Sequence, residues 1–193
     1  MSRLPALVAL FVLSGAAGLM YESIWTRYLG LFVGHSAYAQ LLVLVIFLGG
    51  MSLGAHVVGR RSARLREPLL WYAAVELAVG LIALVFHPLF VAVTNGAYDA
   101  LFPALGALGG GALVTVAKWA LAALLILPQS VLLGATFPLM SAGALRRAPA
   151  APGRALALLY FANSLGAAGG VLVAGYALIG RVGLPGTLVA AAA

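Results

Sequence analysis

The chain has 193 residues, of which 64% are hydrophobic and 8% are charged. Soluble domains carry roughly 25% charged residues, so this composition excludes a soluble globular domain and predicts an integral membrane protein. The net charge of +7 comes from basic residues in short loops between apolar runs, which indicates membrane orientation rather than a nucleic-acid surface. The absence of cysteine excludes disulfides, thiolate catalysis and cysteine metal sites.

The first predicted membrane helix covers residues 4–30. Its apolar part ends near Met20, and Tyr21, Trp25 and Tyr28 follow at positions i, i+4 and i+7. These three rings therefore share one helix face, and we expect them at the level of the lipid headgroups, where amphipathic rings anchor helices.

Glu22 and Arg27 belong to the same helix but point about 140° apart, so each is expected to find a partner on another helix. Arg3 and the small residues 14–18 are also typical of a signal-peptide cleavage region. We expect this segment to remain as a membrane helix instead.

Further apolar segments predict four more crossings and the beginning of a sixth helix. Pro128 and Pro138 each remove a backbone donor inside the fourth segment, so we expect that helix to be interrupted. The Gly- and Pro-rich stretch 94–111 predicts a surface-lying or re-entrant segment. The predicted helix ranges after the first are 36–58, 69–93, 112–145, 154–180 and, for the start of the sixth, 186–193.

The predicted fold is thus an all-α, polytopic transmembrane bundle with five full helices and the start of a sixth. This count places Arg3, the arginines of loop 60–66 and those of segment 146–154 on one side. The positive-inside rule then predicts a cytoplasmic N-terminus, and we expect a bacterial cytoplasmic membrane. Residues 186–193 are too few to span a bilayer, so the sixth helix looks cut off in mid-element.

Small residues at helical spacing predict close helix packing in two segments. The glycine clusters do not follow predicted strands, so nucleotide binding is not expected, and we expect no cofactor. The predicted packing positions are Gly50 and Gly54 in the second helix and Ala162, Gly166, Gly170 and Ala174 in the fifth.

Ionisable residues inside the apolar segments are the candidate functional positions, because each costs at least ~2.5 kcal/mol near the bilayer centre unless it is shielded or paired. We hypothesise a polar layer that joins Glu76 to Asn163, and an interhelical ion pair between Glu22 and Lys118. Two interpretations stay open: these groups fix helix register, or they serve transport or ligand binding.

The histidines His56 and His87 lie near predicted helix ends, so an interfacial position is expected for both. Neither has a second His or a carboxylate at metal-ligand spacing, and we expect no metal site.

Several segments, in order, resemble one family. The string Tyr21-Glu22-x-x-Trp25-Thr26-Arg27, which follows the opening stretch from residue 11, is the most specific, and the ranges 48–54, 72–80, 127–139 and 160–166 agree with it. They resemble the N-terminal membrane domain of membrane-integrated, spermidine synthase-like proteins. In that family a multi-helix, major-facilitator-like domain is fused to a cytoplasmic aminopropyltransferase domain. The resemblance covers nearly the whole chain and implies a link to polyamines.

The chain also departs from this family. The family has an acidic residue in the loop after the second helix, where Ala63 stands here, which argues against a transporter-like gating charge pair. Only Glu22, Glu67, Glu76 and Asp99 are acidic, and no strand–glycine-loop–helix unit is present to hold a nucleoside. No catalytic residue is therefore carried over to this chain.

Three functions remain open for this chain. It could be the non-catalytic membrane domain of a spermidine synthase-like protein, with a soluble enzyme domain either downstream or absent. It could instead be half of a secondary transporter-like unit, or an accessory structural subunit of a larger membrane complex. The expected partners are the lipid bilayer and other membrane helices, in the chain's own further segment, a second copy or a larger complex; nucleic acid is not expected.

Overall fold

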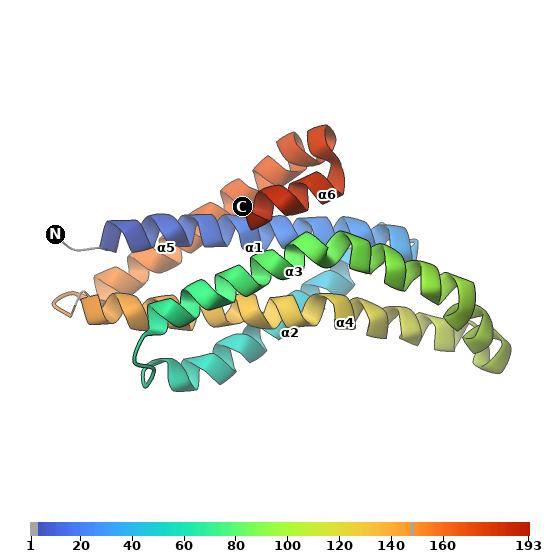
Figure 1. The fold of residues 1–193 in the computed structure, drawn as a ribbon, viewed down its shortest axis with the longest axis horizontal. Helices are drawn as coiled ribbons and strands as arrows, with labels where there is room; N and C mark the ends of the chain where they lie inside the picture. The colour runs from blue at the N-terminus through green and yellow to red at the C-terminus, as the bar shows by residue number, and fades with distance from the viewer. Residues whose placement is uncertain (1–3, 148) are drawn as a thin grey trace.

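The structure, a computed structural model, describes residues 4–147 and 149–193, and it is helical throughout apart from short connections. The prediction of an all-α fold is confirmed. The long helices run roughly along one axis of an elongated bundle (Figure 1). The elements are α1 (Leu4–Val33), α2 (Ser36–Ser62), α3 (Pro68–Gly96), the π-helical turn η1 (Ala97–Leu101), α4 (Phe102–Arg147), α5 (Pro152–Val173), the π-helical turn η2 (Ala174–Leu178) and α6 (Ile179–Ala192).

Within the described residues, four helical runs are long and apolar enough to cross a membrane. Two of them are single elements, Leu4–Val33 and Ala37–Ser62, and two are joined elements, Pro68–Arg147 and Pro152–Ala192. A run of 80 residues cannot be one straight crossing, since about 20 residues already span the hydrocarbon core.

The joined run from α3 to α4 reverses at two glycines. Gly109 and Gly110 have non-helical backbone angles, with φ of 67° at Gly110, a value that residues with a side chain rarely adopt. In Figure 1 the chain turns back here, and the hairpin reaches beyond the other helix ends. The stretch 94–111 is helical up to this turn, because the π-helical turn η1 continues α3. Its expected surface-lying or re-entrant position in the membrane stays a prediction.

The prolines of α4 do not interrupt it, contrary to the prediction. The only non-helical angles in the element are those of the two turn glycines, and Pro128 and Pro138 lie inside continuous helix. Side-chain donors close by bind backbone carbonyls: Gln129 Nε2 donates to Leu125 O, and Ser130 Oγ to Ile126 O, at 3.3 and 3.0 Å. These bonds go to carbonyls next to that of Leu124, the one that Pro128 leaves without its backbone donor, so they reinforce the surrounding turn rather than replace the missing bond.

Close backbone approach joins the helices in two pairs. In α2, a Cβ on Gly50 or Gly54 would collide with Ser130 or Val131 of α4, and one on Gly134 of α4 would collide with Met51. Between α1 and α5 the same holds for three further glycines. These contacts are Gly15 with Asn163, Gly166 with Val12, and Gly170 with Ala16. Ala162 and Ala174 of the same α5 and η2 face are buried.

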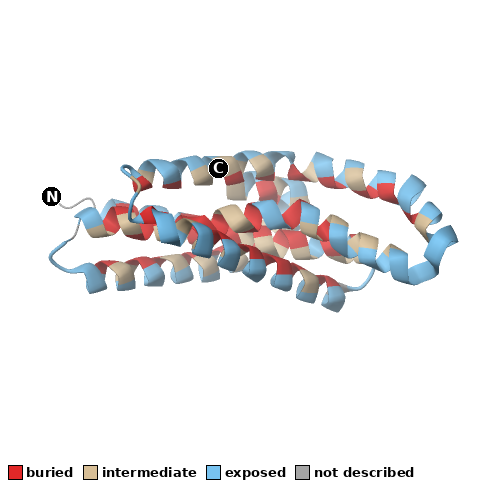
Figure 2. Cartoon of the chain, turned by 90° about the horizontal axis from the view of Figure 1, so that it is seen from below, coloured by how far each residue is buried: buried red, intermediate tan, exposed pale blue. Residues whose placement is uncertain are grey.

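Aromatic rings fill the other half of the bundle. Tyr21, Trp25 and Tyr28 are only 2%, 0% and 4% exposed. Trp25 and Tyr28 pack against Phe86 and Phe90 of α3, and Tyr21 stacks on Trp25. The expected headgroup-level anchor was therefore wrong, since the shared face turns into the protein. Figure 2 shows buried positions on the inward sides of the helices and exposed positions outside.

Candidate functional site

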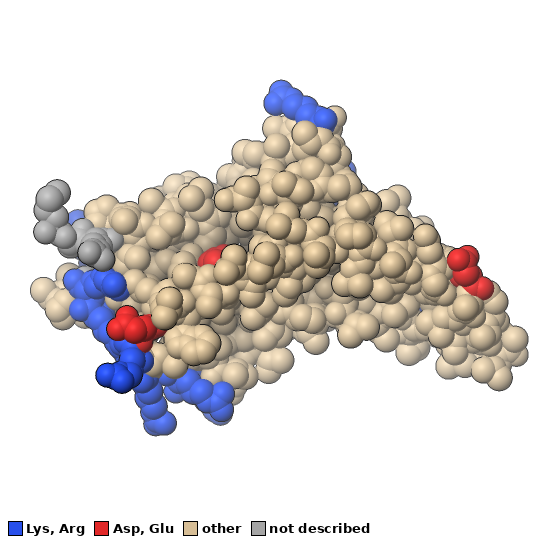
Figure 3. All heavy atoms as spheres, viewed as in Figure 1, with Lys and Arg blue, Asp and Glu red and all other residues tan. Residues whose placement is uncertain are grey.

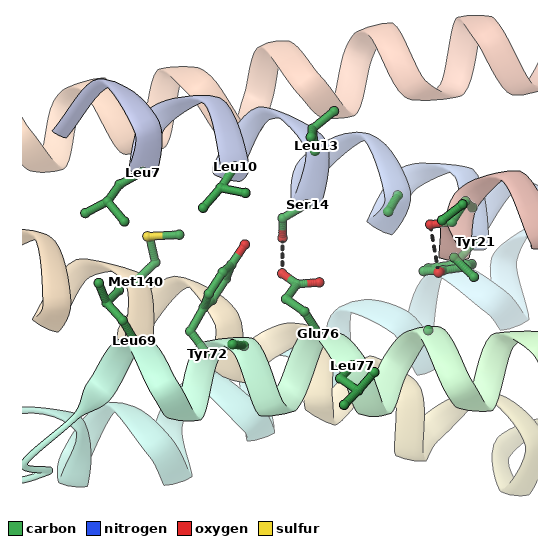
Figure 4. A pocket seen from close by; sticks show the side chains of 16 residues that line it. Leu7, Leu10, Leu13, Ser14, Tyr21, Leu69, Tyr72, Glu76, Leu77 and Met140 are labelled. Carbon is green, nitrogen blue, oxygen red and sulfur yellow. Dashed lines mark hydrogen bonds between the residues drawn. The ribbon is translucent and has the colours of Figure 1, made fainter. Parts of the chain in front are cut away.

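A cavity of about 500 Å³ lies between α1 and α3 and is closed at one side by the last residues of α6. Most of its walls are aliphatic, and leucines of α1 and α3 stand around it in Figure 4. Its polar side chains are Ser14, Tyr21, Tyr72 and Glu76. A mostly apolar hollow with a few polar groups is the usual form of a ligand site.

Glu76 is the acid of this cavity. The Ser14 hydroxyl donates a hydrogen bond of 2.5 Å to its Oε1 atom, across the gap between α1 and α3 (Figure 4). Glu76 lies eight residues after Pro68, about 12 Å along α3 at 1.5 Å per residue. The side chain is half-buried, and its second oxygen is not used by Ser14.

Two tyrosines flank the carboxyl. The Tyr21 hydroxyl donates to the carbonyl oxygen of Ala191 at 3.0 Å, which ties α6 to α1 at the edge of the cavity. Tyr72 is buried and stacks edge-on against Phe11, with ring centroids 6.2 Å apart. The two rings therefore hold the walls of the cavity in place on either side of Glu76.

The charged side chain of the cavity is acidic, and no basic side chain among the described residues balances it. Among residues 4–147 and 149–193, none of the side chains that line it is a lysine, an arginine or a histidine. A carboxylate in apolar surroundings is costly unless a cation, a proton or a hydrogen-bond donor compensates it. The arrangement can therefore hold a proton or a positively charged group at Glu76.

Asn163 lies on the other side of α1. It lines a second cavity of about 360 Å³, together with Ser52 of α2 and Thr136 of α4. Ser14 lines both cavities. The hypothesised direct layer from Glu76 to Asn163 is thus not formed: Glu76 bonds to Ser14, and Asn163 packs on Gly15.

The hypothesised ion pair between Glu22 and Lys118 is also not formed in the described part of the chain. The Lys118 Nζ atom instead stands 5.3 to 5.8 Å from the ring centroids of Phe32, Tyr98 and Phe102. Because Phe32 follows Glu22 by ten residues, this position is about 15 Å further along α1. Because the helix continues through 94–111, α4 begins further along the bundle than predicted. Lys118 therefore lies too far along the bundle to pair with Glu22.

The remaining candidates are dispersed. Arg27 is exposed and Glu22 is half-buried, and neither lines the cavity of Glu76. His87 is half-buried, and its Nδ1 atom lies 2.8 Å from the Tyr28 hydroxyl; its expected interfacial position stays a prediction. His56 is exposed. Within residues 4–147 and 149–193, no three His, Asp or Glu side chains gather to hold a metal ion.

Sequence reasoning missed Ser14 and Tyr72 as parts of the site. Ser14 was visible only as one of the small residues in a packing or cleavage stretch. Tyr72 precedes Glu76 by four positions, so both lie on one face of α3. That spacing could have marked Tyr72, while only a structure could bring Ser14 to the same place.

Comparisons of the chain with protein-family models, with curated proteins and with solved structures found no match.

Proposed function

We propose that the chain is the non-catalytic membrane domain of a spermidine synthase-like protein, and that the cavity at Glu76 binds an amine-bearing ligand within the membrane. The proposal includes five crossings and the start of a sixth, with the N-terminus on the cytoplasmic side of a bacterial inner membrane. Its family part is supported by the motif of α1. Its ligand part is carried by one observation: a carboxyl group, hydrogen-bonded by Ser14, in a mostly apolar cavity whose described lining has no basic side chain.

The chemistry of the cavity favours an alkylammonium group. A protonated amine offers both the positive charge and the N–H donors that a carboxylate accepts. Aromatic faces such as those of Tyr21 and Tyr72 also attract cations. The leucines of both helices suit the alkyl chain that carries the amine, since the walls are mostly aliphatic.

The test compares n-dodecylamine with n-dodecanol, which has the same chain and no charge, as stabilisers of the purified protein in detergent. The amine is expected to raise the midpoint of thermal unfolding more than the alcohol. In Glu76→Gln the apparent affinity for the amine should fall roughly 10- to 100-fold, the range of a lost charged hydrogen bond.

Glu22→Gln is the matched control, because it removes the same charge from a membrane helix outside the cavity. It should leave the response to the amine unchanged. Equal stabilisation by alcohol and amine, or an unchanged response in Glu76→Gln, would show that the cavity is not an amine site.

The non-catalytic part of the proposal has its own test. The purified chain, incubated with putrescine and decarboxylated S-adenosylmethionine, should form no spermidine. Turnover by the chain alone would contradict the proposal, because it would require a nucleoside site that the sequence does not predict.

A second candidate is half of a transporter-like unit. The observation that favours it is Ser14, which lines the cavities on both sides of α1 and so joins Glu76 to a polar region with Ser52, Thr136 and Asn163. In reconstituted liposomes, this candidate predicts uptake of radiolabelled spermidine that Glu76→Gln abolishes and Glu22→Gln retains. Amine binding without uptake would eliminate it.

An accessory structural subunit is the third candidate. From the sequence, a large exposed apolar and small-residue face on the fifth helix would favour it, and apolar side chains such as Phe161 and Leu165 of α5 are exposed. Gly166 and Gly170 are instead buried against α1, so this face is already used within the chain. The third candidate has the least support.

A further inference from the structure

One end of the bundle carries most of the positive charge. In Figure 3, lysine and arginine atoms gather at the end where α2 meets α3 and where α4 meets α5, next to one patch of acidic atoms. Three grooves open at this end, and each has one arginine in its lining: Arg61, Arg146 and Arg154. We call these the three arginine grooves.

The groove of Arg61 lies between α2 and α3 and has a volume of about 360 Å³. Val58, Val75 and Leu139 form its apolar walls, and the exposed indole of Trp71 stands beside it. An exposed tryptophan next to an arginine is typical of the boundary between acyl chains and headgroups.

The groove of Arg154 lies between the first turns of α1 and α5 and is larger, about 580 Å³. Leu4, Val8, Ala155 and Leu158 are among its walls, and Arg154 is the charged side chain among the described residues that line it. The side chain of Arg154 is exposed.

The groove of Arg146 crosses α4 between α2 and α5, with a volume of about 460 Å³. Its arginine has a structural task, because the guanidinium donates to the carbonyls of Ala63, Leu65 and Arg66 and holds the loop between α2 and α3. Ser141 also lines this groove, and its hydroxyl is buried without a hydrogen-bond partner in the described structure.

The shared construction suits one kind of molecule. A guanidinium binds a phosphate through two parallel hydrogen bonds, and the apolar depth of each groove accepts hydrocarbon rather than water. Anionic headgroups also concentrate in the cytoplasmic leaflet, to which basic segments of membrane proteins turn. A soluble anion would gain only the arginine and would leave the apolar walls uncovered.

We propose that two of the three arginine grooves, those of Arg61 and Arg154, bind anionic phospholipids, each with the phosphate at its arginine and an acyl chain along its apolar wall; the guanidinium of Arg146 is already bound to the loop carbonyls. These lipid sites are separate from the Glu76 cavity, and the lipid proposal does not depend on the amine proposal.

The test is native mass spectrometry of the purified, delipidated chain with equal amounts of palmitoyl-oleoyl phosphatidylglycerol and phosphatidylcholine. The wild-type chain should retain the anionic lipid in preference. The double variant Arg61→Gln/Arg154→Gln should lose roughly tenfold in this retention, as expected when charge-assisted contacts to phosphate are removed. Arg146 is left intact because of its bonds to the loop.

The matched control is Arg60→Gln/Arg64→Gln, which removes the same charge from exposed positions at the same end, outside these groove linings. It should retain the anionic lipid as the wild type does. Equal losses in the two double variants, or no preference for the anionic lipid in the wild type, would overturn the proposal.

A second measurement needs no variant. Soluble glycerophosphoglycerol, the headgroup without acyl chains, should not displace the bound phosphatidylglycerol from the wild-type chain at equal concentration. Displacement by this headgroup would mean that the arginines bind the phosphate alone and that the grooves hold no acyl chain.

Discussion

The two halves of α1 are held in the bundle by different kinds of contact. The first half approaches α5 backbone to backbone, with Gly166 against Val12 and Gly170 against Ala16. The second half packs ring on ring, with Trp25 and Tyr28 against Phe86 of α3. Within a membrane both contacts rest on van der Waals packing rather than on the hydrophobic effect. The comparison shows that one helix can pack through close backbone contact along its first half and through large aromatic side chains along its second half.

The largest effect should come from the ring-packed half. Trp25→Ala removes a fully buried indole and should cost about 3–5 kcal/mol of unfolding free energy, as large-to-small core changes do. Chemical denaturation in mixed micelles measures it. Trp71→Ala is the control, because that indole is 55% exposed; equal losses in the two variants would mean that ring packing does not stabilise this half.

The glycine-packed half should respond to one added methyl group. Gly166→Ala places a Cβ against the backbone carbonyl of Val12, which cannot move aside, and should cost about 1–3 kcal/mol. Gly169→Ala, whose Cβ would meet nothing within 4 Å, should be neutral or slightly stabilising. The same denaturation measurement applies. If the two alanines behaved alike, close approach would not be what holds α5 to α1.

The ammonium group of Lys118 connects the ring-packed half of α1 with the hairpin of α3 and α4. Lys118→Met keeps most of the aliphatic stem of the side chain and removes the charge that faces three aromatic rings. The expected loss is about 1–2 kcal/mol. Hydrogen exchange near the η1 turn measures it, since the variant should exchange faster there. Unchanged protection would assign the packing to the rings alone.

The smallest effect should come from a single hydroxyl. Tyr28→Phe keeps the ring contacts and removes the hydrogen bond to His87. This change should cost about 1 kcal/mol of unfolding free energy. Tyr38→Phe is the control at an exposed tyrosine. A cost for Tyr28→Phe close to that of Trp25→Ala would show that the polar contact, and not ring packing, dominates this half.

The sequence predicts the two halves unequally well. Hydropathy was sufficient for the all-α membrane class, because apolar runs of this length have few other solutions. Spacing showed that Tyr21, Trp25 and Tyr28 share a face, but it could not show which neighbour that face meets. The prediction therefore placed the rings at the lipid interface, whereas in the structure they lie in the core.

Of the candidate site, Glu76 was identified from its cost in an apolar helix, and its partner was not. Asn163 has a similar depth, but depth along the membrane leaves the rotation of each helix undetermined. The Ser14 hydroxyl, on the intervening helix, was too ordinary a residue to be selected. The predicted ion pair of Lys118 was wrong for another reason. Gly and Pro in 94–111 suggested a break in the chain where a π-helical turn continues the helix.

The hairpin of α3 and α4 offers a direct readout of sidedness. Its tip reaches past the other helices (Figure 1), and a Cβ at Gly106 or Gly111 would meet nothing within 4 Å. Since the chain has no cysteine, a single thiol introduced at either glycine would be the only one present. A membrane-impermeant maleimide would then report which compartment the tip faces, and with it the orientation of every helix in the bundle.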